Sequence, residues 1–187
     1  MVHMNQKWNN NEFEIILELL KGKIHARELS KKLSIPLTTL IRLLKELRNK
    51  NIIDYKQEGK NKVYELKKSA EARIYVFNAE NYKLLKVIKK YPLLAPIIEK
   101  IQKNSKINLA VLFGSYAKCL AKENSDIDIY IDTEDRKLKQ EISEINSNIN
   151  TKIGNFNLSS LLIKEIIKNH VMIKGLEVFY EKNQFFE

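Results

Sequence analysis

The chain has 187 residues and a mass of 22.0 kDa, which allows one large domain or two small ones. Its composition, 44% hydrophobic and 30% charged, excludes a disordered tail, and no apolar run approaches the roughly 20 residues that span a membrane. The 33 Lys and Arg outnumber the 23 Asp and Glu, and the net charge of +10 indicates a polyanionic partner. A single cysteine excludes a disulfide scaffold, and the opening residues MVHMNQKWNN lack the apolar segment of a signal peptide, so we expect a cytoplasmic protein without membrane contact.

The positive charge lies in the first part of the chain. Residues 1–69 carry +7, residues 70–103 carry +4, and residues 104–187 carry −1. A surface that binds a polyanion is therefore expected before residue 104, and two modules with different partners explain the step in charge.

Three helices are predicted before residue 50. Apolar residues recur at helical spacing from Glu12 to Leu20, and Gly22 follows close to the end of this pattern. A second, short helix is expected at about residues 25–33. Pro36 is well placed near the first turn of a third helix, which runs to about Asn49 and carries, away from its leucines, Thr38, Thr39, Arg42 and Lys45.

Two β-prone runs follow, at residues 52–56 and 62–66, around a turn that contains Gly59. This order of elements, over about residues 10–67, resembles a winged helix-turn-helix DNA-binding domain of the transcription-regulator type. The resemblance implies that the third helix enters the major groove, where Thr38, Thr39 and Arg42 meet base edges or phosphates beside Lys45, and that Lys60 and Lys62 of the wing meet the DNA backbone. The alternative is a module for protein packing or dimerisation with a solvated basic face.

Residues 69–104 are expected to form helices that connect the two modules. Ser69 can cap a helix that continues to Lys90, although a short strand at residues 73–77 is an alternative. Pro92 and Pro96 open a further helix to about residue 104. Such helices either dimerise or serve as a spacer, and we expect a homodimer because winged-helix regulators read palindromes by two-fold symmetry.

The second module begins with an apolar run at residues 107–113 that stops at Gly114-Ser115, before a helix-compatible segment at residues 116–122. From residue 125 to 132, acidic or tyrosyl side chains alternate with isoleucines, which predicts a strand with Asp126 and Asp128 on one face. Two such carboxylates can hold a divalent cation, and a Gly-Ser turn that opens a helix presents N–H groups and a hydroxyl to phosphate oxygens. Metal-assisted nucleotidyl transfer needs these parts.

The segment LFGSYAKCLAKENSDIDIYI resembles the signature of the DNA-polymerase-β-type nucleotidyltransferase superfamily in its minimal form: Gly-Ser, ten residues, then Asp-x-Asp. The resemblance extends over about residues 104–181, where VMIKGLEVFYE resembles the closing strands of the minimal members. It implies that Gly114 and Ser115 grip the phosphates of an NTP substrate. It also implies that Ser115, Asp126 and Asp128 are catalytic, with the two aspartates as ligands of Mg²⁺ or Mn²⁺.

Two positions depart from that signature. Cys119 stands where a second glycine usually follows Gly-Ser; we expect it to be packed within the helix. A third carboxylate, expected on a later strand to activate the acceptor hydroxyl, is missing, because residues 145–164 contain no Asp or Glu. The β-prone run at residues 152–157 offers only Asn155 and Asn157, and an amide cannot act as a general base at neutral pH. His170 is expected to cap a helix C-terminus rather than to take part in catalysis.

The sequence thus predicts an α+β chain: a winged helix-turn-helix domain at residues 1–68, a helical connector at residues 69–104 and a small mixed-sheet nucleotidyltransferase domain at residues 105–187. The leading hypothesis is a DNA-binding, antitoxin-like enzyme that uses Mg²⁺ to transfer a nucleoside monophosphate, AMP foremost, from an NTP to a protein hydroxyl, with an HEPN-type toxin as the acceptor. The alternative is a transcription regulator whose transferase domain is catalytically impaired and binds nucleotide or acts as a scaffold. RNA-end modification ranks last because the second module has no basic cradle.

Overall fold

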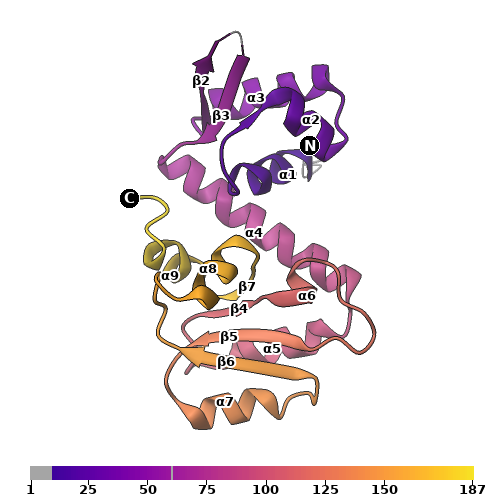
Figure 1. Cartoon of the computed structure of the whole chain (residues 1–187), viewed down its shortest axis with the longest axis vertical. Helices are drawn as coiled ribbons and strands as arrows, with labels where there is room; N and C mark the ends of the chain where they lie inside the picture. The colour runs from indigo at the N-terminus through magenta and orange to yellow at the C-terminus, as the bar shows by residue number, and fades with distance from the viewer. Residues whose placement is uncertain (1–9, 60) are drawn as a thin grey trace, which may run out of the picture. The chain divides into compact units, whose positions relative to one another are not determined.

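The computed structural model describes residues 10–59 and 61–187, and it is α+β throughout (Figure 1). Lys60, predicted as a wing contact, and residues 1–9, which bear on a signal peptide, lie outside the described residues. The chain forms two compact units, residues 1–79 and 80–187, and the boundary between them falls inside the helix α4 (Ala70–Lys90). Among the described residues, no helix is both long and apolar enough to cross a membrane.

The N-terminal unit has the element order of a winged helix-turn-helix. The predicted helices and hairpin are confirmed as α1 (Asn10–Leu19), α2 (Ala26–Leu33), α3 (Leu37–Asn49), β2 (Ile53–Glu58) and β3 (Asn61–Leu66). A strand of two residues, β1 (Ile24–His25), is too short to show a period in the sequence. It pairs antiparallel with β3, which gives a three-stranded sheet of order β1-β3-β2.

Leucines of α3 form the centre of the N-terminal core. Leu40, Leu43, Leu44 and Leu47 are at most 1% exposed, because their spacing places all four on one stripe of the helix. Ser34 adopts a left-handed conformation at the C-cap of α2, and Pro36 follows as the N-cap residue of α3, so the chain turns sharply between the two helices.

The connecting helices are confirmed, and the alternative of a strand at residues 73–77 is wrong. Ser69 caps α4 as predicted: its Oγ accepts a hydrogen bond from the Ala72 N–H at 3.1 Å and donates one to the carbonyl of Asn51 at 2.6 Å. A second helix, α5 (Leu94–Lys103), packs its apolar stripe into the core of the C-terminal unit.

The C-terminal unit is built on a four-stranded mixed sheet of order β6-β5-β4-β7. Its strands are β4 (Ala110–Leu112), β5 (Ile127–Asp132), β6 (Ile149–Gly154) and β7 (Val171–Lys174). β4 pairs antiparallel with β5 and with β7, whereas β5 and β6 run parallel. The remaining helices are α6 (Gly114–Ala117), α7 (Arg136–Ser143), α8 (Leu161–Lys168) and α9 (Leu176–Lys182).

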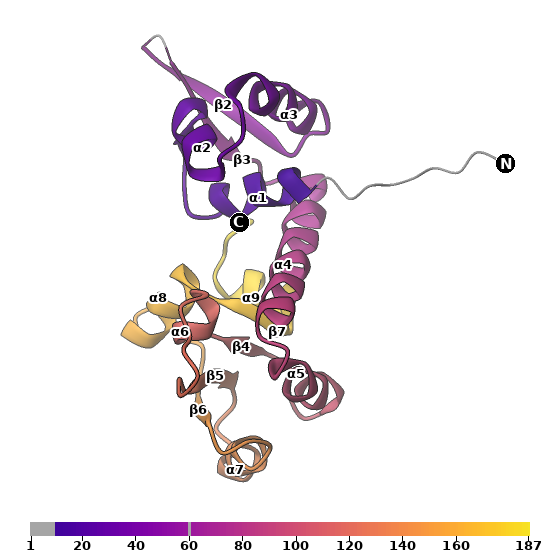
Figure 2. The ribbon, with the colours of Figure 1, turned by 90° about the vertical axis from the view of Figure 1, so that its right-hand side faces the viewer.

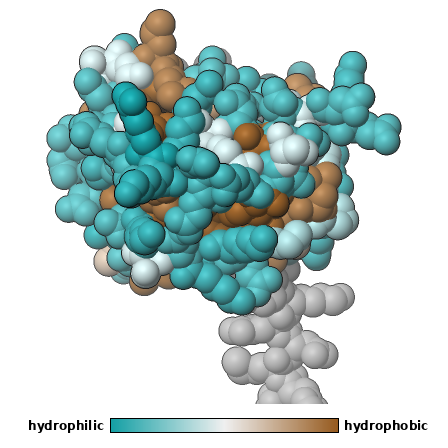
Figure 3. All heavy atoms as spheres, turned by 90° about the horizontal axis from the view of Figure 1, so that it is seen from below, coloured by the Kyte–Doolittle hydropathy of each residue, from teal (hydrophilic) through white to brown (hydrophobic). Residues whose placement is uncertain are grey.

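The alternation predicted for β5 determines which side of the sheet carries the main core. Ile127, Ile129 and Ile131 are fully buried, together with apolar residues of α5 and α7. Asp128 projects from the opposite side of β5. Figure 2 shows α5 on one side of this sheet and α8 on the other. Viewed from the end at which α7 lies, hydrophilic side chains cover most of the surface, and a band of apolar side chains shows between them (Figure 3).

Three local predictions for this unit are wrong. The helix predicted for residues 116–122 is the single turn α6, so Cys119 lies in the turn after it, with φ +57°, rather than within a helix. The predicted closing strands are one strand, β7, followed by the helix α9, because Gly175 takes φ +78° between them. The strand predicted at residues 152–157 begins and ends three residues earlier, as β6.

Candidate functional site

The turn after β4 lies directly against β5. The N–H of Phe113 donates a hydrogen bond to the carbonyl of Asp128 at 2.9 Å. Gly114 takes φ +68°, and a Cβ atom at this position would lie 2.1 Å from Oδ2 of Asp128. Both the backbone conformation and the close approach therefore require glycine. The two ends of the Gly-Ser…Asp-x-Asp motif, predicted to act together, are thus in contact.

The two aspartates of the motif have different surroundings. Asp126 is exposed and precedes β5, whereas Asp128 is half-buried on the strand. Burial raises the pKa of Asp128 above its ordinary value, and the negative charges of Asp126 and Glu165 add to this effect. A hydrogen bond from Asn150 and the positive charge of Lys152 act in the opposite direction. The carboxylates are therefore close enough to repel each other, which favours a bound cation.

Asn150 of β6 is the neighbour of Asp128 that sequence reasoning missed. The two residues are register partners in the parallel pair β5–β6, and Asn150 Nδ2 donates to Asp128 Oδ1 at 2.8 Å. The asparagines named from the sequence lie elsewhere. Asn155 donates to Glu134 at 2.6 Å beyond the end of β6, and Asn157 accepts from the backbone N–H of Ser159 within a turn.

In the part of the chain that the structure describes, no third carboxylate joins Asp126 and Asp128 in a metal-binding group. Within residues 10–59 and 61–187, no cluster of three or more His, Cys, Asp or Glu side chains could hold a metal ion. Glu165 of α8 is near enough to affect Asp128, but its carboxylate is paired with Lys118 at 2.9 Å. The available oxygen donors are the two aspartates and the hydroxyl of the half-buried Ser115, and such hard oxygen ligands fit Mg²⁺ or Mn²⁺.

The predicted DNA contacts of α3 lie on its solvent side. Thr38, Arg42 and Lys45 are exposed and Thr39 is half-buried. Arg42 forms an ion pair with Glu46 at 2.6 Å, so a neighbouring negative charge partly offsets its positive charge. On the wing, the ammonium of Lys62 lies 4.1 Å from the ring centre of Tyr55. Tyr64 is buried, whereas Tyr55 is only half-buried.

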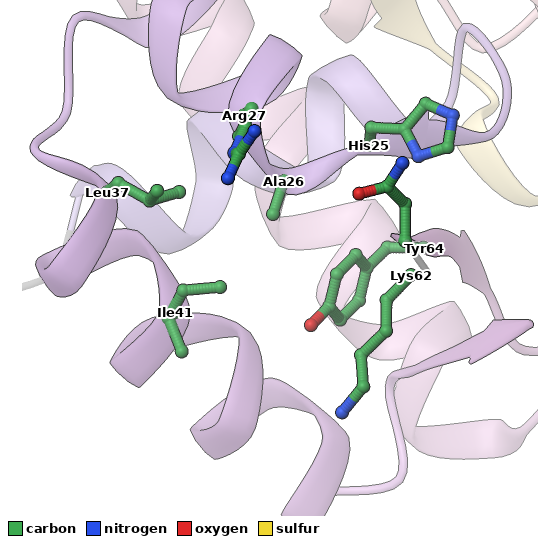
Figure 4. Close-up of a pocket in the computed structure, with 8 residues that line it drawn as sticks. His25, Ala26, Arg27, Leu37, Ile41, Lys62 and Tyr64 are labelled. Atoms are coloured by element: carbon green, nitrogen blue, oxygen red, sulfur yellow. The ribbon is translucent and has the colours of Figure 1, made fainter. Parts of the chain in front are cut away.

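A pocket of about 290 Å³ opens between α2, α3 and β3 of the N-terminal unit. Leu37 and Ile41 line one side, facing Tyr64 and Lys62 of β3, and Arg27 reaches in from the start of α2 (Figure 4). Leu37 is 39% exposed and Ile41 45% exposed. The surface of α3 therefore combines charged and hydroxyl side chains with accessible apolar ones. The sequence predicted DNA contacts for the charged and hydroxyl residues, but not for Leu37 and Ile41.

The C-terminal unit contains a segment that is similar to a known protein family. Residues 96–184 match the family model described as Polymerase beta, Nucleotidyltransferase. The matched segment contains Gly114, Asp126, Asp128 and Asn150. No curated protein sequence matches the chain.

Three solved structures are similar to parts of the chain. They are the transcriptional repressor BigR from Xylella fastidiosa (22% identity, 36% of this chain and 67% of the other, TM-score 0.34) and the adhesin competence repressor AdcR from Streptococcus pyogenes (18% identity, 49% and 69%, TM-score 0.42). The third is a toxin–antitoxin structure with AMP-PNP (22% identity, 57% and 86%, TM-score 0.33). With TM-scores this low, no function is transferred from them.

Proposed function

We propose that the C-terminal unit is a nucleotidyltransferase that moves a nucleoside monophosphate, AMP foremost, from an NTP to a hydroxyl group of a protein. The observation that carries this proposal is the contact between Gly114 and Asp128, inside a segment that matches a nucleotidyltransferase family model. The turn brings backbone N–H groups and the Ser115 hydroxyl to the start of β5, which bears Asp128 and directly follows Asp126.

Each of these residues has a role in the proposed reaction. Gly114 and Ser115 bind phosphate oxygens, while Asp126 and Asp128 hold Mg²⁺, which when bound neutralises the charge of the triphosphate. The acceptor oxygen forms a bond to the α-phosphorus as the bond to the β-phosphate oxygen breaks and pyrophosphate leaves. The acceptor's proton passes to water, because β6 offers no carboxylate to take it.

Incubation with α-³²P-labelled NTPs and Mg²⁺ tests the transfer, with candidate partner proteins present, including a small all-helical HEPN-type toxin. We expect label on a protein band with wild type and at least a 100-fold loss with Asp126→Ala or Asp128→Ala. Asp54→Asn, in the N-terminal unit, is the matched control and should leave labelling unchanged. Labelling that persists in both aspartate variants would reject the site.

We further propose that the predicted N-terminal domain, residues 1–68, binds duplex DNA as a homodimer. Its contacts would come from α3 and from the wing, which is the hairpin of β2 and β3. The excess of positive charge in residues 1–69 and the exposed Thr38, Arg42 and Lys45 support this. Accessible Leu37 and Ile41 suit contact with thymine methyl groups. Arg42→Ala should weaken binding to a duplex selected from a random pool by about 1–3 kcal/mol. Binding that ignores DNA sequence would contradict the proposal, and light scattering tests the dimer.

A transcription regulator with a catalytically impaired transferase domain is the second candidate. It is favoured by β6, which places an amide rather than a carboxylate beside Asp128. This candidate predicts DNA binding and nucleotide binding by the purified protein without label transfer to any acceptor. Transfer at a rate that depends on Asp128 would exclude it.

A further inference from the structure

The face of β6 that adjoins the aspartates carries one amide and one ammonium group. Asn150 pairs in register with Asp128, and Lys152, two residues further on the same face, pairs with Tyr130. Lys152 is exposed, and the register places it on the same face of the sheet as Asn150 and Asp128. Toward Asp128 this side of the site therefore presents an amide donor and an ammonium group, and no carboxylate.

A pair of divalent cations places strict demands on such a site. Two metal ions that act together lie about 3.5–4 Å apart, and oxygens must be supplied to both of them. A carboxylate that joins two cations uses one oxygen for each. Asp128 is the more enclosed of the two aspartates and the one nearest β6, so the freedom of its two oxygens determines whether a second cation can bind.

Each oxygen of Asp128 has a close neighbour that restricts the approach of a cation on its side. Oδ1 accepts a hydrogen bond from Asn150 Nδ2 at 2.8 Å. Oδ2 faces the Cα of Gly114 so closely that a Cβ there would lie 2.1 Å from it. Access from the β6 side is thus limited by an amide donor, whose hydrogens point at the lone pairs a cation would use. Asp126 is exposed before the start of β5 and leaves the other side open for one cation.

We propose that this site takes a single divalent cation, and that Asn150 and Lys152 of β6 occupy the place of a second one. Asn150 is a positioning residue, since it fixes the Asp128 carboxylate for one metal ion. Lys152 supplies the positive charge that a second cation would bring to the nucleotide phosphates. This inference rests on the proposed nucleotidyltransferase function and makes that function specific.

The test counts Mn²⁺ bound per folded full-length chain. Free Mn²⁺ is measured by electron paramagnetic resonance in the presence of an ATP analogue with a methylene group between the α and β phosphorus atoms, and binding to the analogue alone is subtracted. We expect one Mn²⁺ per chain at saturation. Asn150→Asp removes the amide donor and adds a carboxylate, and it should bring the count to two.

Asn155→Asp is the matched control, because it adds the same charge beyond the end of β6, beside Glu134. It should leave the count at one. Two Mn²⁺ per wild-type chain would overturn the inference while leaving the proposed function intact. The absence of any bound Mn²⁺ would reject both the single-cation inference and the proposed nucleotidyltransferase function. A count of one in Asn150→Asp, with an unchanged circular dichroism spectrum, would reject the role given to Asn150.

The role of Lys152 has an independent readout in the affinity for the same analogue at saturating Mn²⁺. Lys152→Gln should weaken binding about tenfold, whereas Lys164→Gln, at an exposed position of α8, should not change it. Equal affinities for the wild type and Lys152→Gln would show that the ammonium does not contact the phosphates. The stoichiometry measurement would then decide the remaining part of the proposal.

Discussion

Replacement of Glu80 by Gln should destabilise the C-terminal unit at neutral pH and have little effect in acid. Glu80 is 1% exposed, and its Oε1 accepts from Nε2 of His170 at 3.0 Å and from the hydroxyl of Tyr180 at 2.9 Å. Nδ1 of His170 faces the carbonyl oxygens of Ile166 and Ile167, at 3.0 and 3.1 Å. Both ring nitrogens of His170 therefore face hydrogen-bond acceptors, one of which is the Glu80 carboxylate.

The size of the effect follows from the pKa of Glu80. Burial alone would raise it, but the charge and hydrogen bond of His170, with Lys83 and Tyr180, lower it from 4.5 to about 2. A lowered folded-state pKa stabilises the fold above pH 4.5, and the stabilisation is lost as the pH falls through 2. The shift corresponds to about 3 kcal/mol at pH 7. Removal of one partner of a buried pair costs a similar amount, about 3–5 kcal/mol.

Urea unfolding followed by circular dichroism at pH 7 and pH 3 measures this difference. Glu80→Gln should lose about 3 kcal/mol relative to wild type at pH 7, and the gap should narrow by about 2 kcal/mol at pH 3. Glu181→Gln, at an exposed position of α9, serves as the control and should follow the wild type at both pH values. A gap below about 1 kcal/mol at pH 7, or one that is equal at the two pH values, would refute the charged pair.

Three further substitutions test local features of the fold. Gly114→Ala should abolish nucleotide binding, because the added Cβ would meet the carboxylate of Asp128. Gly59→Ala is the control: Gly59 has a similar φ of +58° and no atom lies within 4 Å of the added Cβ, so this variant should lose stability without losing nucleotide binding. Retained nucleotide binding in Gly114→Ala would contradict the contact. Cys119→Gly should be more stable than Cys119→Ala by about 1 kcal/mol in thermal unfolding, since φ is +57° there. Asp135→Ala should cost about 1 kcal/mol in the same assay, because Asp135 Oδ1 accepts from two backbone N–H groups at the start of α7, and an unchanged melting temperature would show that the cap does not contribute.

Much of the candidate site could be predicted because its parts are local in sequence. Isoleucine alternation sets the orientation of β5, and a glycine before a short turn sets the approach of α6 to it. The spacing between Ser115 and Asp126 then brings the two ends of the motif together. All of these residues belong to two elements that are neighbours along the chain, the turn at α6 and the strand β5. The contact of Gly114 with Asp128 therefore follows from sequence pattern and backbone sterics.

The partner of Asp128 on β6 could not be predicted for a different reason. β5 and β6 are joined through α7, and their parallel register depends on how that helix packs on the sheet rather than on any local turn. A difference of a few residues in the position of β6 replaces Asn150 by another side chain. The ion pair of Glu80 and His170 is equally hidden, because it joins residues 90 positions apart.

The helix α9 was missed although its sequence carried a signal. Leu176, Phe179 and Tyr180 have the spacing i, i+3, i+4 of a helix, and Gly175 is where the chain must turn: a Cβ there would lie 2.0 Å from the carbonyl oxygen of Asn108. The apolar periodicity of this segment predicts the helix that the structure contains, whereas the resemblance to closing strands does not.

Cys119 and Asn150 affect the candidate site in physically different ways. Cys119 retains the left-handed conformation at a position where glycine adopts it without cost, so the turn is preserved at an expense of about 1–2 kcal/mol. Asn150 instead donates a hydrogen bond to Asp128 and places a neutral amide beside it. Because Gly114 lies against Asp128 and Asn150 donates to it, the amide on β6 acts on the chemistry of the carboxylate rather than on the turn, and the count of bound cations is the measurement most sensitive to it.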